Sequence, residues 1–419
     1  MPDTSLPRAD LLQFHMLTTF PPHNVNRDED GRPKSCQLGG TLRGRISSQA
    51  KKRALRFAPH FPEAQRAKRT REAGIRCYRQ LTAAGIDDVH AVWAALAVNH
   101  ATGAGGNAPT LAEAEKLLGG GGKGGKKGKA AAPAEDAIID RAAVEKALGT
   151  EQGLVISTRE FARIDEAMAR LIQAWQEDRD GFAGHLETWV RQVAKDKLLT
   201  TDDHDLDTAL FGRMVAADPG FNIEAACAVG HAFTTHAFRE EPDYFSAGEE
   251  LNELKGTGAA ITSYAFFGGG VYYQHAVLDR GHLRENLTRG RTLAEAKLLA
   301  DQAIDAFLTG LVLSQPKGKR NSHASDVGAS YVLVTRGGDP SLNLGLAFLD
   351  PVTTDQDSDI MKASIGRLAD FQQKLAEAYG LGNDICIFNA YPPARANQPA
   401  VNEVWTMAEL RNFVLGPRT

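Results

Sequence analysis

A short cationic segment, Gly44 to Arg56 (GRISSQAKKRALR), combines serine hydroxyls with closely spaced lysines and arginines. If a helix begins at Ser47 or Ser48, its free backbone amides, the two hydroxyls and the positive end of the helix dipole can hold a phosphate. Spacings of three and four residues place a polar set on one face, while two alanines and Leu55 can face inward. That polar set is Gln49, Lys52, Arg53 and Arg56. The segment therefore predicts a helix that binds an anionic polymer.

The net charge of the whole chain hides this region. The formal charge is −4, yet Thr41 to Arg79 holds twelve Lys and Arg against two acids, a net of +10 that leaves −14 for the remainder. This asymmetry is expected when one surface faces a nucleic acid and the rest keeps the protein soluble. The plain alternative is a solvated helix face, and charge alone favours that alternative.

Two further loops carry cations. The loop Pro316 to Asn321 (PKGKRN) contains Gly318, which permits a close approach of backbone to phosphate. Its cations are Lys317, Lys319 and Arg320. Arg27, in the loop VNRD, is a candidate phosphate clamp, and a surface ion pair with Asp28 is its alternative.

An aromatic, glycine-rich stretch runs from Arg239 to Tyr273. We expect a hairpin-like arm here, on which Tyr244 and Phe245 could stack on bases. Burial of these rings in a core is the competing interpretation for each of them.

Residues for catalysis are sparse. His231 and His236 are five apart with no intervening Glu, and the four cysteines are scattered without a CxxC pair. The strongest candidates for a catalytic or metal-bound carboxylate are Asp28 and Asp30, for which a solvated acidic loop is the alternative. We therefore expect no catalytic residue, no metal site and no cofactor.

Apolar periodicity predicts the elements that position these residues. A strand over Leu11 to Leu17 precedes the basic segment, whose helix runs to about Phe57. Further helices are expected near 86–97, 161–175, 182–197, 223–236, 293–313, 361–379 and 407–414, and further strands at 271–278, 331–335, 344–349 and 385–389. Helices and strands mix without a regular βαβ repeat, so the fold class is α+β. The glycine–lysine segment 119–132 cannot bury enough apolar surface to order itself, which predicts a disordered loop.

The chain has enough apolar residues, 42%, for a sizeable core, and no run approaches 18 consecutive apolar residues. Its first residues, MPDTSLPRAD, contain acids where a secretory signal has a basic region. We expect a cytoplasmic protein with no membrane partner.

Several blocks resemble the CasC backbone subunits of type I-E CRISPR Cascade complexes, which belong to the RAMP superfamily. The specific blocks are VNRD (25–28) and GGTLRGRISSQAKKRALR (39–56), followed by LFGRM (210–214). Weaker similarity continues in the same order through GHAFTTHAF (230–238), FFGGGVYYQHA (266–276), GKRNSHAS (318–325) and SLNLGLAF (341–348). The region from Leu96 to Ala147 departs from the family by its length.

The resemblance implies a modified RRM-like (ferredoxin-like) palm, a helical fingers insertion and a protruding thumb hairpin. In this sequence the palm would comprise residues 1–60, 200–240 and 271–419, the fingers 61–199 and the thumb 241–270. The family's function implies a non-catalytic subunit that polymerises along the spacer of one guide RNA and presents kinked segments for pairing with target DNA. Its partners would be the guide RNA, neighbouring copies of itself, and the end-capping, large and small subunits.

The resemblance also implies roles for individual residues. Met214 would wedge against bases, and the thumb with Phe245 would fold over a neighbouring copy. Contacts to RNA are implied for Arg27, Arg45, Ser47, Ser48, Gln49, Lys52, Arg53, Arg56, Arg213, Lys317, Lys319 and Arg320.

Two other functions stay open at this point. Relatives of this backbone in other CRISPR classes cleave target RNA with an acidic residue in the early loop, where Asp28 and Asp30 stand. A single-strand RNA-binding protein that does not polymerise is the other alternative.

Overall fold

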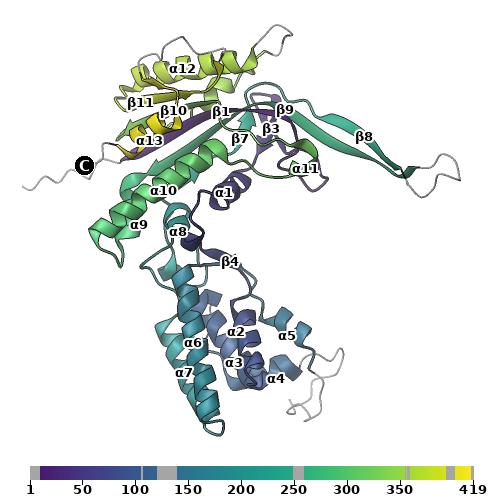
Figure 1. Ribbon diagram of the computed structural model, residues 1–419, viewed down its shortest axis with the longest axis vertical. Coiled ribbons are helices and arrows are strands. Elements are labelled where there is room, and N and C mark those ends of the chain that lie inside the picture. The colour runs from purple at the N-terminus through teal and green to yellow at the C-terminus, as the bar shows by residue number, and fades with distance from the viewer. Residues whose placement is uncertain are drawn as a thin grey trace, which may run out of the picture. The chain divides into compact units, whose positions relative to one another are not determined.

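The computed structural model describes residues 10–104, 107–119, 139–248, 259–353, 355, 359–392 and 402–416. The chain divides into two compact units. The sheet unit comprises Met1–Glu63, Ala226–Glu285 and Ala294–Thr419, and the helical unit comprises Ala64–Ala225 and Asn286–Leu293. Figure 1 shows the elements of each. The finer division into palm, fingers and thumb stays a prediction.

A ten-stranded sheet organises the described part of the sheet unit, in the order β12-β11-β10-β1-β9-β7-β3-β2, with β6 and β8 also paired to β9. Its strands are β1 (Leu11–His23), β2 (Ser35–Leu38), β3 (Thr41–Ile46), β6 (Cys227–Val229), β7 (Ala232–Thr234), β8 (Glu241–Gly248), β9 (Ala259–Asp279), β10 (Tyr331–Gly337), β11 (Asp384–Asn389) and β12 (Glu403–Val404). All the pairings are antiparallel except that of β11 with β12.

Strand β1 is buried on both faces because helices cover the sheet from two sides (Figure 1). Successive side chains of a strand point to opposite faces. On one face, Phe14 meets Phe307 of α10 (Leu293–Leu313), with ring centroids 5.9 Å apart. On the other, Leu17 packs in a cluster with Leu368 of α12 (Ile360–Tyr379). The burial of both faces extends to polar residues of β1, since Gln13 and His15 are buried between its apolar residues.

Four shorter helices also lie wholly or partly in this unit. They are α1 (Ser48–Arg56), α9 (Arg280–Thr288), α11 (Arg320–His323) and α13 (Met407–Leu415), with a 3₁₀ segment η4 (Leu344–Phe348). Helix α1 follows β3 directly, so the strand-to-helix turn predicted at the basic segment is confirmed.

Strands β8 and β9 form a hairpin that extends beyond the rest of the sheet (Figure 1). Strand β9 is 21 residues long and pairs with β1 along one part and with β8 along the other. One continuous strand therefore anchors the hairpin in the sheet.

The helical unit is built from helices around one apolar core. The helices are α2 (Ala73–Ala83), α3 (Asp88–Asn99), α4 (Leu111–Gly119), α5 (Arg141–Leu148), α6 (Thr158–Glu177), α7 (Phe182–Asp196) and α8 (Leu206–Phe211), with η1 (Glu63–Gln65), η2 (His100–Ala104) and η3 (Pro219–Phe221). Helix α3 is central, since six of its side chains are fully buried. A two-stranded sheet of β4 (Lys68–Thr70) and β5 (Leu154–Ile156) completes the unit.

The predicted α+β class is confirmed, and most of the predicted elements are found within a few residues of their expected ends. The helix predicted at 223–236 is wrong: this stretch forms β6 and β7, whose backbones pair with β9. The strand predicted at 344–349 is also wrong. Asn343 caps a 3₁₀ turn there by accepting the Gly345 amide, and the buried Arg43 guanidinium binds the carbonyl oxygen of Phe348 at 2.8 Å.

Most of the glycine–lysine segment 119–132 lies outside the described residues. Among the helices that the structure does describe, none has the length and apolar character needed to cross a membrane.

Candidate nucleic-acid interface

Helix α1 begins with a serine cap, and the backbone amides predicted to hold a phosphate are largely paired within the protein, since those of Ser47, Ser48 and Ala50 donate to its own side chains. Ser47 is its N-cap, and the Ser47 hydroxyl accepts the Ala50 amide at 3.2 Å. Ser47 itself is buried, Ser48 is half-buried and Gln49 is exposed. The two serines therefore differ, because one closes the helix and the other lies where solvent reaches it.

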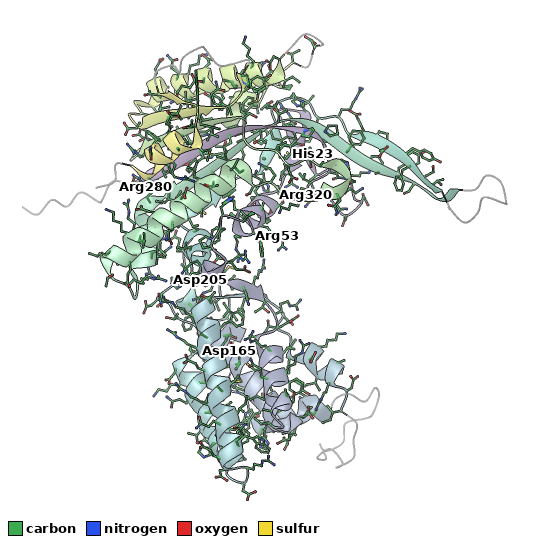
Figure 2. The ribbon with its side chains drawn as sticks, in the orientation of Figure 1. His23, Arg53, Asp165, Asp205, Arg280 and Arg320 are labelled. Carbon is green, nitrogen blue, oxygen red and sulfur yellow. The ribbon has the colours of Figure 1, made fainter. Side chains whose placement is uncertain are left out.

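The face of α1 that carries the predicted cations is the face open to solvent. Arg53 is exposed, while Lys52 and Arg56 are half-buried. The Arg53 guanidinium lies over the exposed ring of Phe57, 4.7 Å from its centroid. Figure 2 labels Arg53 on this helix and Arg320 in α11 of the same unit.

The opposite face of α1 fixes the helix to the sheet unit. Leu55 is buried against Gly310 of α10, where an added Cβ would lie 2.4 Å from a Leu55 methyl carbon. Lys51 is also buried, and its Nζ donates to Gln315 Oε1 at 2.5 Å. Burial lowers the pKa of Lys51 to about 7. Lys51 therefore anchors the helix and adds no charge to the exposed face.

The loop that carries Arg27 is tied to the start of α1. Asn26 Oδ1 accepts the Ser47 amide at 2.8 Å. On another side, Gly318 packs against the backbone of this loop, since an added Cβ would lie 2.4 Å from the Val25 carbonyl oxygen. The structure thus brings together three predicted cationic segments: the Arg27 loop, α1 and the loop Pro316 to Asn321.

The last of these loops is partly engaged in other contacts. Lys317 and Arg320 are exposed, and Lys319 has a left-handed backbone that begins α11. Arg320 Nε donates to Asp326 Oδ2 at 2.6 Å. Because both side chains of that pair are about half exposed, the pair is weak and a phosphate can compete for Arg320.

Arg45 and His231 flank the first turn of α1. Strand β3 pairs with β7 so that Ile46 lies opposite Ala232, which places Ser47 and His231 side by side. His231 Nδ1 accepts the Ser48 amide at 3.0 Å and lies 3.3 Å from the Arg45 guanidinium.

Asp28 organises its own loop. Its Oδ1 accepts the amides of Asp30 at 3.1 Å and Arg32 at 2.8 Å, which is the hydrogen-bonding pattern of an Asx turn. Arg32 in turn pairs with Glu240 and lies over the ring of Phe266, 4.3 Å from its centroid, at the base of the hairpin. Within the described residues, no group of three or more His, Cys, Asp or Glu is placed to hold a metal ion.

Arg213, in the helical unit, is not a surface cation. Its side chain is 1% exposed and forms an ion pair with Glu160, whose side chain is fully buried, at 2.7 Å. The remaining guanidinium nitrogens donate to the carbonyl oxygens of Phe221 and Thr200. A phosphate could reach Arg213 only by displacing these partners, so we assign it a structural role in place of the predicted RNA contact.

The neighbouring Met214 is 73% exposed, which is unusual for a large apolar side chain. Its backbone is held on both sides. Arg213 exchanges two backbone hydrogen bonds of 2.9 Å with Ile223, and the Val215 amide donates to Asn222 Oδ1 at 2.7 Å. Met214 is therefore presented to solvent by an ordered loop.

The hairpin exposes aromatic side chains on both of its faces. Tyr244 and Tyr264 are cross-strand partners with ring centroids 5.3 Å apart, and both are more than half exposed. Phe245, which is 44% exposed, follows Tyr244 and points to the opposite face. The core alternative for these rings is therefore wrong.

Comparison with known proteins adds to this geometry. A family model described as CT1975-like protein matches residues 12–412. The chain belongs to the CT1975-like protein family. No curated protein matches the sequence of this family member.

Two solved structures resemble this CT1975-like protein over nearly its whole length. A chain of a "CRISPR RNA-guided surveillance complex, pre-nicking" is 22% identical with a TM-score of 0.70, and the match covers 97% of this chain and 99% of that one. A chain of a "CRISPR RNA-guided surveillance complex" is 17% identical with a TM-score of 0.54, covering 97% and 98%. At such identities the likeness shows the fold, which is the modified RRM-like α+β class expected from the sequence.

The sequence analysis missed several residues of the candidate interface of this CT1975-like protein. Asn26 and His231 both lie in blocks that the sequence analysis singled out, yet a side chain that accepts one backbone amide leaves no periodic signal. Tyr264 could have been found from its alternation with neighbours in a long strand. The burial of Lys51 could not have been found, because lysines are rarely buried.

Proposed function

We propose that this protein is a backbone subunit of a CRISPR RNA-guided surveillance complex of type I-E, with copies arranged along one guide RNA. The observation that carries the proposal is the convergence of exposed cations around the first turn of α1, on a helix whose other face is fixed by Leu55 and Lys51. A rigid cationic face that also carries the Ser48 hydroxyl suits a sugar-phosphate backbone. Contacts to the sugar-phosphate backbone position a nucleic acid and carry no direct sequence information.

Three further observations support the proposal. The fold is shared with chains of two CRISPR RNA-guided surveillance complexes. The exposed Met214 suits insertion between bases, and the aromatic hairpin suits contact with RNA or with a neighbouring copy. Sequence specificity would then belong to the guide, as in other RNA-guided systems.

We propose further that the subunit does not cut RNA. The candidate carboxylate of Asp28 already accepts two amides of its own loop, which suits a structural role. Incubation of the assembled complex with complementary RNA and Mg²⁺ tests this. Regularly spaced cuts that are lost in Asp28→Ala would establish the endoribonuclease in its place.

The test of RNA binding is co-expression with a repeat–spacer transcript, followed by native mass measurement. We expect one RNA with several copies of the chain. A single copy on each RNA would favour the RNA-binding protein that does not polymerise, and protein free of RNA would refute the proposal.

A charge-reversal variant locates the RNA contact. Lys52→Glu combined with Arg53→Glu should abolish stable RNA retention while the protein stays folded, because both side chains reach solvent. The matched control is Arg191→Glu with Lys195→Glu, two exposed cations of α7. Equal RNA retention by the two variants at moderate salt would place the RNA elsewhere on the protein.

A further inference from the structure

His231 occupies a fixed position beside the candidate interface. It lies in the turn between β6 and β7, where the Gly230 amide donates to the His275 carbonyl oxygen at 2.8 Å. The Gln274 side chain donates to the Gly230 carbonyl oxygen at 3.1 Å. These two hydrogen bonds to β9 fix the backbone of the turn, and so they fix the position of the imidazole.

The neighbours of His231 determine which ring nitrogen carries the proton. Nδ1 lies 3.0 Å from the Ser48 amide and 3.3 Å from the Arg45 guanidinium, and both of these groups are donors. Nδ1 must therefore be an unprotonated acceptor, and the proton of the neutral ring is on Nε2. Partial burial, together with Arg45 and Lys34, lowers the pKa of His231 and so favours the neutral ring.

The other side of the ring is available to a ligand. His231 is exposed, and within the described part of the chain Nε2 has no hydrogen-bond partner. An N–H donor is thus held next to Arg45 and Ser48, two residues already implicated in phosphate contacts.

We propose that His231 is a further RNA-contacting residue, which donates its Nε2 proton to a backbone oxygen of the guide RNA. This inference rests on the proposed function. The acceptor is a phosphate oxygen or a ribose 2′-hydroxyl, since both lie along the sugar-phosphate strand that α1 would bind. The ring acts as a neutral donor, in contrast to the lysines and arginines around it.

Two substitutions separate RNA contact from structural support. In His231→Asn, the amide oxygen takes the place of Nδ1 and can still accept the Ser48 amide, but the Nε2 donor is lost. In His231→Gln, the amide nitrogen takes the place of Nε2 and keeps the donor, while the Nδ1 acceptor is lost. A direct contact predicts that Asn weakens RNA binding by about 3- to 10-fold, as for the loss of one hydrogen bond, and that Gln retains more affinity.

The measurement is the dissociation constant for a single-stranded RNA oligonucleotide at several salt concentrations. Because the neutral ring displaces no counterion, His231→Asn should leave the slope of log affinity against log salt unchanged, whereas Lys52→Gln should lower it by about 0.7. His185→Asn, an exposed histidine of α7, is the control substitution. Thermal unfolding shows whether each variant keeps the wild-type fold.

The outcomes are distinct. Wild-type affinity in His231→Asn would overturn the inference, and so would a larger loss in His231→Gln than in His231→Asn, because the ring would then act only by holding Ser48. A 2′-deoxy oligonucleotide identifies the acceptor: a persistent difference between wild type and His231→Asn indicates phosphate, and its disappearance indicates the 2′-hydroxyl. Failure of the wild-type protein to bind RNA would refute the proposed function itself.

Discussion

Arg43, Lys51 and Arg213 are cations that the structure withdraws from solvent, and each is held by oxygen atoms of the protein. Arg43 binds backbone carbonyls, Lys51 binds a glutamine and Arg213 binds Glu160. Their hydrogen bonds and ion pairs therefore stabilise the packing of β3, α1 and the Met214 loop. The exposed cations near them keep their charge for a ligand.

The buried pair of Arg213 and Glu160 should dominate the stability of the Met214 loop. Glu160→Gln leaves the Arg213 charge without its counter-ion in a buried site, which should cost about 3–5 kcal/mol. Chemical denaturation of the helical unit measures this change. The exposed pair of Glu187 and Arg191 provides the control, since Glu187→Gln should change stability by less than about 1 kcal/mol. Equal losses of stability in Glu160→Gln and Glu187→Gln would show that the buried ion pair contributes no more than the exposed one.

A second buried site should make stability depend on pH. The rings of His15 and His275 stack in the sheet with centroids 4.6 Å apart. Burial lowers the pKa of His275 from 6.5 to about 4, and burial together with His275 lowers the pKa of His15 further below its usual value.

Because the unfolded chain binds these protons more readily, stability should fall as pH decreases from 6.5 towards about 4. His275→Phe keeps an aromatic ring and removes one titrating group, so its unfolding free energy should depend less steeply on pH in this window. Denaturation at pH 7, 5.5 and 4.5 measures the dependence, and a wild-type slope in the variant would contradict the assignment.

At the scale of elements, most of the predictions that rest on apolar periodicity and on helix caps are confirmed. The strand β1, the helix α1 with its serine cap and the long helices α10 and α12 are found where expected. Prediction failed at β6, β7 and η4, whose conformations depend on pairing with β9 and on the Arg43 side chain. Those partners are distant in sequence, so local patterns carry no trace of them.

The start of α1 separates two serines that the sequence treated alike. Ser47→Ala removes the helix cap and should lower stability by about 1 kcal/mol. Ser48→Ala should leave stability within about 0.5 kcal/mol of wild type, because no cap is lost, but should weaken RNA binding. Thermal unfolding and RNA titration on the same two proteins measure both effects. A larger loss of stability in Ser48→Ala than in Ser47→Ala would contradict the assignment of Ser47 as the helix cap.

For the whole molecule, the basic region Thr41 to Arg79 belongs to two compact units. The boundary between the units falls at Glu63 and Ala64, so its cations divide between two compact bodies. In the helical unit, Arg76 pairs with Asp165 and Arg79 with Glu145. The net charge counted along the sequence thus includes cations that are already in ion pairs, and the contact of α1 with RNA, which the resemblance implies, stays a prediction.

The aromatic hairpin should act between copies of the molecule rather than within one. Replacing Tyr244, Phe245 and Tyr264 together by Ser should leave the sheet unit folded, since all three rings are exposed beyond the main sheet. If the hairpin contacts the RNA or a neighbouring copy, native mass measurement after co-expression with a repeat–spacer transcript should show fewer copies on each RNA than for wild type. The binding of one copy to a short oligonucleotide should change much less, because α1 is intact. An unchanged number of copies would mean that the exposed rings serve neither contact, and that the basic face of α1 and the rest of the sheet unit are sufficient for assembly.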